Sequence, residues 1–255
     1  MKAEITAIIP AYNASLYIGE AIESVLNQTI PCRLIIVDDA SGDGTYAIAK
    51  SYEQSRPERI QVIRNQKNAG VANARNVAMQ QADTEYLAFL DADDWWSPEK
   101  LEVQLELMKK TNASLCYTGR ELMRQDGSPS GKTIRVPEEI SYRKLLKGNV
   151  IPCSSILVRR EDALEYPMVH DELHEDYIMW LSMLRDGRKF VGINEPFLKS
   201  RLAEQGKSRN KKKSARMTYQ VYRYMGIPVW QAVYYFCCYA WNGWKKYAGK
   251  ILREK

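Results

Sequence analysis

Three aspartates, Asp91, Asp93 and Asp94, stand within four positions at the end of the apolar run in FLDADDWW. Two carboxylates that lie two positions apart in a turn can point the same way, and without neutralisation each raises the pKa of the other. Mg²⁺ or Mn²⁺ removes that repulsion, and it typically binds one or two protein carboxylates together with phosphate oxygens and water. The spacing therefore predicts a divalent metal ion that binds a diphosphate. Aspartate is also common in turns, so the motif alone leaves a structural role open.

Two further acidic positions could take part in chemistry. Asp38 and Asp39 follow a second apolar run in IIVDDASGDGT, where a carboxylate can accept a hydrogen bond from the N–H of a nucleobase. Asp176 in HEDYIMW begins a segment in which Ile178 and Leu181 repeat at helical spacing. Considered without other information, an acid at this position is typical of a helix N-cap or first turn.

The aspartates at 38–39 and 91–94 follow short apolar runs that alternate with amphipathic segments. The expected strands are residues 5–10, 34–37, 60–63 and 86–90, and the expected helices between them are residues 18–26, 46–52 and 72–80. This alternation predicts an α/β fold with a Rossmann-like, mainly parallel sheet flanked by helices. Ligands of such sheets bind beyond the carboxyl ends of the strands, so we expect the polar loops to meet at one edge.

The rest of the chain is less regular. Ser97, Pro98 and Glu99 predict the start of a helix directly after the acidic turn. Beyond it we expect a turn to about residue 132, a short helix at 142–146, a strand at 155–158 and the helix that Asp176 begins. The expected division is a domain over 1–215, with a nucleotide-binding half at 1–95 and an acceptor-binding half at 96–215, followed by a helical tail at 216–255.

Composition fits an ordinary globular enzyme with a local excess of positive charge. The 255 residues are 45% apolar and carry a net charge of +6, and eight lysines and arginines between Lys199 and Arg216 face one acid, Glu204. Five cysteines without metal-type spacing, and a start that lacks the pattern of a secretory signal, favour a reducing cytoplasmic compartment.

The C-terminal tail combines aromatic and basic residues. Its apolar stretch, residues 227–241, is too short for a comfortable bilayer crossing, which takes about 20 residues. Aromatic residues beside Lys245, Lys246 and Lys250 fit a segment that lies among the headgroups of an anionic leaflet. The alternative is a helix packed on the domain or on another subunit of an oligomer.

Five ordered motifs give the chain a resemblance to a known family. AIIPAYN, IIVDDASGDGT, NAGVANARN, YLAFLDADDWW and HEDYIMWLSM resemble the family 2 inverting glycosyltransferases of the GT-A fold over roughly residues 4–205. They are similar in particular to bacterial members that build capsule, O-antigen and teichuronic-type polysaccharides.

The resemblance implies a role for each matching residue. The nucleotide site would be lined by Pro10, Ala11, Tyr12, Asp39, Arg75, Asp91 and Ala92. Within it Asp39 would contact the base, Asp93 would be the principal ligand of Mn²⁺ or Mg²⁺, and Asp91 would bind the ribose or share the metal. Asp176 would deprotonate the acceptor hydroxyl, with Glu175 beside it as the alternative base. Arg201 and Ser208 would lie on a loop that closes over the diphosphate, although the histidine usual in that loop is missing.

The resulting hypothesis is a metal-dependent inverting glycosyltransferase that moves a sugar from a nucleotide donor, UDP-linked, to a lipid-linked saccharide. It would act in the cytoplasm, peripherally on the inner face of the cell membrane. One alternative is a nucleotidyltransferase, but IIPAYN is not the glycine-rich basic loop that such an enzyme needs. The other is a nucleic-acid-binding module that uses the basic segment at 207–216, and the acidic corner argues against it.

Overall fold

The computed structural model describes residues 3–202 and 211–251. The strands are β1 (Ile5–Ala11), β2 (Cys32–Asp38), β3 (Ile60–Arg64), β4 (Tyr86–Phe89), β5 (Trp95–Trp96), β6 (Leu115–Met123), β7 (Pro129–Ile134), β8 (Leu157–Arg159) and β9 (Phe190–Arg201). The α-helices are α1 (Ile18–Leu26), α2 (Thr45–Ser55), α3 (Val71–Gln81), α4 (Lys100–Thr111), α5 (Tyr142–Leu145), α6 (Arg160–Glu165), α7 (Glu175–Arg185), α8 (Lys211–Tyr224) and α9 (Val229–Ile251), and a 3₁₀ turn, η1, covers Cys153–Ser155.

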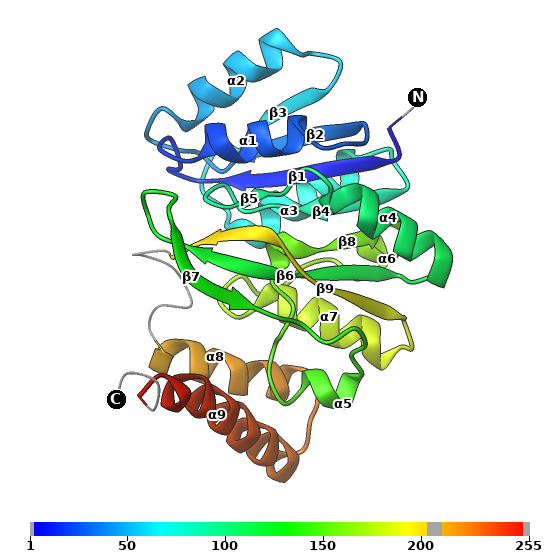
Figure 1. The fold of residues 1–255 in the computed structure, drawn as a ribbon, viewed down its shortest axis with the longest axis vertical. Helices are drawn as coiled ribbons and strands as arrows, with labels where there is room; N and C mark the ends of the chain where they lie inside the picture. Colours follow the sequence, from blue (N-terminus) through cyan, green and yellow to red (C-terminus); the bar gives the residue numbers. More distant parts are fainter. Residues whose placement is uncertain (1–2, 203–210, 252–255) are drawn as a thin grey trace.

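One mixed sheet runs through the molecule in the order β3, β2, β1, β4, β8, β6, β9, β5, with β7 paired to β6 (Figure 1). The first four strands in that order are parallel, and β8 is antiparallel to both of its neighbours. The predicted α/β fold with a mainly parallel, helix-flanked sheet is therefore confirmed. Because β1 lies between β2 and β4, the loops after these three strands meet at the edge where parallel sheets bind ligands.

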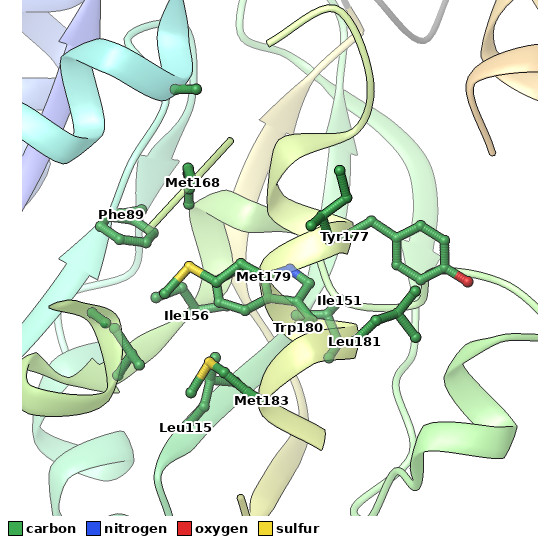
Figure 2. Close-up of a cluster of buried hydrophobic side chains, with 14 of the residues drawn as sticks. Phe89, Leu115, Ile151, Ile156, Met168, Tyr177, Met179, Trp180, Leu181 and Met183 are labelled. Carbon is green, nitrogen blue, oxygen red and sulfur yellow. The ribbon is translucent and has the colours of Figure 1, made fainter. Parts of the chain in front are cut away.

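Alternate side chains of the central strands serve two separate cores. Ile8 and Phe89 face the side covered by α3 and α7, whereas Ile9 and Ala88 face the side covered by α1 and α4. Figure 2 shows the first core around Trp180 of α7, which is fully buried beside residues of β4 and β6. Burial of both faces explains why the strands appear in the sequence as continuous apolar runs.

The helix after the acidic turn begins later than predicted. Its first residue is Lys100 instead of Pro98, and Ser97 provides no side-chain cap. The Leu101 N–H donates instead to Gln28 Oε1 at 3.0 Å, and Gln28 Nε2 donates to the Ser97 carbonyl at 2.9 Å. A buried glutamine that is distant in the sequence thus replaces the expected local cap, because a first-turn N–H needs an acceptor from any source.

Several elements of the second half were not predicted. The segment expected to be a turn to about residue 132 contains β7, and the long strands β6 and β9 lacked a clear alternating pattern. Gly192 of β9 explains part of this difficulty, because a Cβ there would lie 2.1 Å from the Pro137 carbonyl oxygen. This strand therefore needs a residue of low strand propensity at a close approach of two backbones.

The C-terminal helices pack on the domain with one face. Tyr222 of α8 is buried and donates a hydrogen bond to the Leu146 carbonyl at 2.7 Å, and α9 lies along α8 through the Tyr219–Phe236 and Tyr222–Tyr235 ring contacts. The expected boundary between residues 215 and 216 falls inside α8. Within residues 3–202 and 211–251, no helix has both the length and the apolarity needed to cross a bilayer.

Candidate active site

The loops that follow β1 and β2 are fastened to each other by hydrogen bonds. Asn13 N donates to Ser41 Oγ at 3.0 Å, and Gly42 N donates to Asn13 Oδ1 at 2.9 Å. Asn13 and Ala40 both have positive φ, 49° and 60°. A left-handed alanine is rare and costs free energy, so the surrounding contacts must hold it, as is common at functional sites. These hydrogen bonds hold the two loops together at the edge of the sheet.

Three predicted nucleotide-site residues, Pro10, Ala11 and Tyr12, lie at or just after the end of β1, and they differ in exposure. Pro10 and Ala11 are buried in the strand, so only their backbone atoms could contact a nucleotide. Tyr12 is 53% exposed. An exposed aromatic ring at the carboxyl end of β1 is suited to stacking against a nucleobase.

The carboxylate of Asp39, which was predicted to contact the base, makes several hydrogen bonds within the protein. It is buried, and its carboxylate accepts hydrogen bonds from Asn65 Nδ2 at 2.7 Å, Ala69 N at 3.0 Å and Gly70 N at 2.8 Å. From the other side, Asp171 accepts from Ala72 N at 3.0 Å. Two acids therefore hold the N-terminal end of α3, where helical N–H groups lack partners. The sequence did not indicate these supporting contacts.

The acidic turn after β4 places its aspartates in different environments. Asp94 is buried and accepts a hydrogen bond from Arg201 N at 2.9 Å, so it supports the turn, and Ala92 is also buried. Asp91 N donates to Ser154 Oγ at 3.1 Å. Among the described residues no side chain donates a hydrogen bond to the Asp93 carboxylate. Burial, and then the charge of Asp91, raise the pKa of Asp93 to about 6.

The donor set of this turn fits a divalent cation. The residues described hold no group of three or more His, Cys, Asp or Glu that could form a cage for a metal. Mg²⁺ and Mn²⁺ do not need one, since they commonly bind one or two carboxylates and complete the shell with phosphate and water. Asp93 is partly exposed and its carboxylate is costly to ionise, so a bound cation would relieve it, and Asp91 would be the second ligand.

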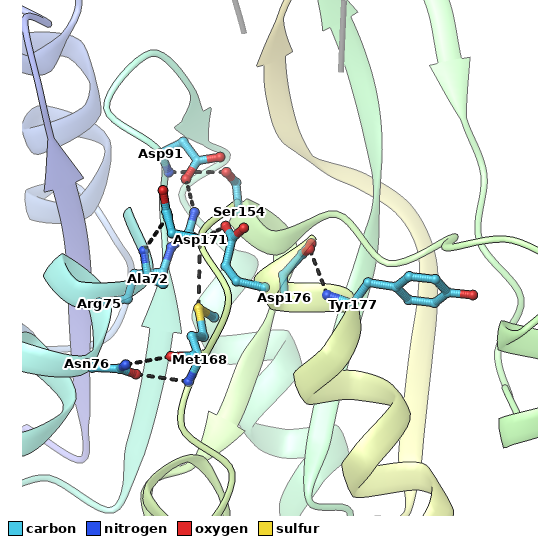
Figure 3. Close-up of polar contacts among 10 residues, drawn as sticks. Ala72, Arg75, Asn76, Asp91, Ser154, Met168, Asp171, Asp176 and Tyr177 are labelled. Carbon is cyan, nitrogen blue, oxygen red and sulfur yellow. Dashed lines mark hydrogen bonds and ion pairs between the residues drawn. The ribbon is translucent and has the colours of Figure 1, made fainter. Parts of the chain in front are cut away.

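Arg75 joins the acidic turn to the start of α7. Its guanidinium contacts Asp91 Oδ1 at 2.6 Å and Glu175 Oε1 at 3.0 Å, and its side chain is only 4% exposed. Figure 3 shows Arg75 reaching from α3 toward Asp91. Arg75 was predicted to approach the nucleotide. The structure brings it to the predicted site, but both ion pairs are to protein carboxylates.

Asp176 lies in the first turn of α7, as predicted, with its side chain partly exposed. Its Oδ1 accepts from the Tyr177 N–H at 2.7 Å (Figure 3). Burial among its neighbours, and then the charge of Glu175, raise the pKa of Asp176 to about 7, and Arg75 opposes this shift. A carboxyl group with a pKa near 7 is suited to accept a proton at physiological pH.

Glu175 is a site residue whose main role the sequence did not reveal. The alternative considered for it was the base itself, but its side chain is 8% exposed and paired with Arg75. The exposed fraction favours Asp176 as the residue that faces a substrate. The acidic pair in HEDY indicated the right position without indicating which acid turns inward.

The predicted diphosphate loop is not supported at Arg201. This residue ends β9 and is buried, and its guanidinium donates to the carbonyl oxygens of Asp93 and Gln125 and pairs with Glu20. It also lies 4.6 Å from the Tyr17 ring. Arg201 therefore supports the acidic turn from a strand and does not lie on a closing loop. Ser208 falls outside the described residues.

Comparison with known proteins identifies the family. The chain matches the model described as Glycosyl transferase family 2 over residues 6–166, more than half of its length. It is a family 2 glycosyltransferase. The matched segment contains the loops after β1 and β2, Arg75 and the acidic turn, whereas Asp176 follows it.

Two relatives match this glycosyltransferase over nearly its full length. TuaG of Bacillus subtilis (strain 168), whose name assigns it to teichuronic acid biosynthesis, is 40% identical over 96% of this chain and 98% of its own. WfgD of Escherichia coli is named as a UDP-Glc:alpha-D-GlcNAc-diphosphoundecaprenol beta-1,3-glucosyltransferase. It is 35% identical over 96% of this chain and 95% of its own.

Solved structures show the same fold. TarS of S. aureus in complex with UDP-GlcNAc superposes with a TM-score of 0.73 at 18% identity, over 88% of this chain and 66% of that one. PcManGT, a mannosyltransferase from Pyrobaculum calidifontis in complex with GDP-Man and Mn²⁺, gives a TM-score of 0.67 at 16% identity, over 88% of this chain and 64% of that one. These structures have the GT-A fold, as predicted for this glycosyltransferase.

Replacement of Arg75 should destabilise the glycosyltransferase. Arg75→Met removes the partner of a Glu175 carboxylate that stays buried, so we expect a loss of about 3 kcal/mol, the lower end for a buried pair that loses one member. Urea unfolding would measure it. Arg33→Met is the matched control, because the Arg33–Asp83 pair is 43% and 66% exposed and should contribute less than about 1 kcal/mol. Equal losses in the two variants would contradict this role of Arg75.

Proposed function

We propose that this glycosyltransferase moves a sugar from a UDP-linked donor to a lipid-linked saccharide, with inversion at the anomeric carbon, in the synthesis of a bacterial surface polysaccharide. The observation that carries the proposal is Arg75, whose ion pairs join Asp91, two positions before Asp93, to Glu175, the residue before Asp176. It joins a turn suited to a metal and diphosphate to a carboxylate suited to act as a base.

Asp176 acts on the acceptor in this proposal. Its carboxylate accepts the proton of the acceptor hydroxyl while that oxygen attacks the anomeric carbon, on the side opposite the leaving diphosphate. A direct displacement of this kind inverts the anomeric carbon and needs no covalent intermediate. Glu175 and Arg75 are positioning residues, since each acts through a neighbouring carboxylate.

The donor is held by the other residues of the edge. Tyr12 offers its ring to the base, and the backbone of the loop after β2 borders the same space. Asp93 and Asp91 would hold Mn²⁺ or Mg²⁺, which when bound supplies a Lewis acid that neutralises charge on the leaving diphosphate. The donor assignment draws support from the UDP-GlcNAc complex of TarS, and the metal from the Mn²⁺ complex of PcManGT.

The acceptor and the place of action are inferred from the relatives. The name of WfgD states a diphosphoundecaprenol acceptor, and that of TuaG states a role in teichuronic acid biosynthesis. We therefore infer a lipid-linked acceptor and action at the inner face of the cell membrane, with the C-terminal tail as the peripheral contact.

A transfer assay tests the proposal. The purified protein would be incubated with Mn²⁺ and a panel of UDP- and GDP-sugars, with and without a lipid-diphosphate saccharide, and the product's anomeric configuration would be read by NMR. We expect acceptor-dependent release of UDP and a product inverted relative to the donor. Release of pyrophosphate would instead indicate the nucleotidyltransferase alternative. Thermal stabilisation by an oligonucleotide, but not by UDP with Mn²⁺, would contradict the proposal.

A further inference from the structure

The outward face of α9 is an exposed apolar stripe. Its side chains recur at helical spacing and remain 48–72% exposed, namely Val229, Trp230, Val233, Tyr234 and Trp241. The opposite face of the same helix packs on α8, where Ala232 is fully buried. Monomeric proteins rarely leave a contiguous stripe of this size uncovered unless it binds something.

A cavity of about 740 Å³ opens beside this stripe, where α5 meets the turn between α8 and α9. Trp230 and Tyr234 belong to both the stripe and the cavity lining, and Leu146 and Ile227 provide buried apolar wall. Arg143 and Lys147 are exposed lining residues. No residue of the candidate active site lines it, so the cavity is a separate feature of the molecule.

The charged residues that line the cavity, Arg143 and Lys147, are both positive. The lining contains no aspartate or glutamate, and no described residue forms an ion pair with the side chain of Arg143 or Lys147. The sequence continues this pattern, because the chain between Glu204 and Glu254 contains eleven lysines and arginines and no acid. A ligand that complements this region must be anionic, and the apolar wall requires that it also carry a hydrocarbon part.

We propose that the cavity and the α9 stripe form a binding surface for anionic phospholipid of a membrane. The phosphate of a headgroup lies between Arg143 and Lys147, and its acyl chains contact Trp230 and Tyr234. Tryptophan and tyrosine favour the bilayer interface, and basic residues beside them favour an anionic leaflet. This inference deepens the proposed function, because it gives an enzyme with a lipid-linked acceptor a means of reaching the membrane.

Vesicle binding tests the inference without relying on sugar transfer. Sedimentation with vesicles of phosphatidylcholine, with or without phosphatidylglycerol, would be compared for the unchanged protein and for the double variant Arg143→Gln, Lys147→Gln. We expect binding only to the anionic vesicles, and a loss of about 25-fold in the variant, since each of the two cations near the surface contributes about a fivefold factor. The matched control, Lys109→Gln with Lys110→Gln on α4, removes the same charge elsewhere and should bind normally.

The aromatic part of the surface has its own test. Trp230→Ser with Tyr234→Ser should likewise weaken binding to anionic vesicles, and both side chains are exposed enough for the fold to tolerate the change. Equal loss in the α4 control, or equal binding to neutral vesicles, would overturn the inference. So would sedimentation velocity showing a dimer that this variant abolishes, because the stripe would then contact a second copy of the chain. Transfer to a water-soluble acceptor analogue should be unchanged in these surface variants, so failure of the vesicle test leaves the proposed sugar transfer standing.

Discussion

Asp176→Asn is expected to lower the rate of sugar transfer by about 10²–10⁴-fold while donor binding is retained, since this is the range that a positioned general base contributes. The amide has the size of the carboxylate but cannot accept the acceptor proton. Transfer would be measured at saturating donor, and donor affinity by titration calorimetry with UDP and Mn²⁺. Glu175→Gln is the comparison, because a transfer rate that fell further in that variant than in Asp176→Asn would assign the base to Glu175.

The same variant should be more stable at neutral pH than the unchanged protein. Burial and the charge of Glu175 raise the pKa of Asp176 to about 7 in the folded state, above the ordinary value of 3.8. Between these two pH values the folded protein keeps the proton of Asp176, whereas the unfolded chain has released it. The free energy of unfolding therefore falls as pH rises through this window. Thermal unfolding at pH 5 and pH 8 should show that Asp176→Asn raises the stability more at pH 8, where the folded carboxyl group is ionised, than at pH 5. A loss of stability at pH 8 would mean that Asp176 has a structural role.

Asp93→Ala is expected to abolish the metal-dependent part of donor binding. Changes to residues that only support a metal ligand already cost about 10–100-fold in affinity, so loss of the principal ligand should cost more than about 100-fold. Calorimetry with UDP, with and without Mn²⁺, would measure the difference. Asp83→Ala is the control, because this exposed aspartate precedes β4 and lies outside the acidic turn.

Asp91→Ala provides the sharper comparison within the turn. Asp91 pairs with Arg75 and is also the proposed second metal ligand. Its removal should therefore weaken both metal-dependent binding and stability. Asp93 has no such partner among the described side chains, and its removal should leave stability unchanged or slightly higher, since the pKa of Asp93 is raised. Metal-dependent binding that survived in Asp93→Ala would place the principal ligand elsewhere.

The first half of the fold was predictable because its signals are local. Strands β1, β2 and β4 are short apolar runs buried on both faces, and the helices between the first four strands carry apolar residues at helical spacing. In the second half, β9 contains Gly192 where Pro137 approaches, and α4 takes its cap from Gln28. Neither contact leaves a periodic pattern in the sequence, because both depend on segments brought together only by folding.

The sequence by itself determined which residue types stand at the carboxyl ends of the strands, because parallel strands end at a common edge. Asp39, Asp91 and Asp93 could therefore be chosen from their spacing after the strands, and Asp176, in the first turn of a helix, from the family resemblance. Only the tertiary structure decided what each side chain does there. Asp39 accepts a hydrogen bond from the backbone at the start of α3, and Arg201 donates one to the acidic turn. Arg75 pairs with both Asp91 and Glu175. The physical reason is that hydrogen bonds and ion pairs depend on distances of about 3 Å between side chains far apart in sequence, which no local pattern specifies.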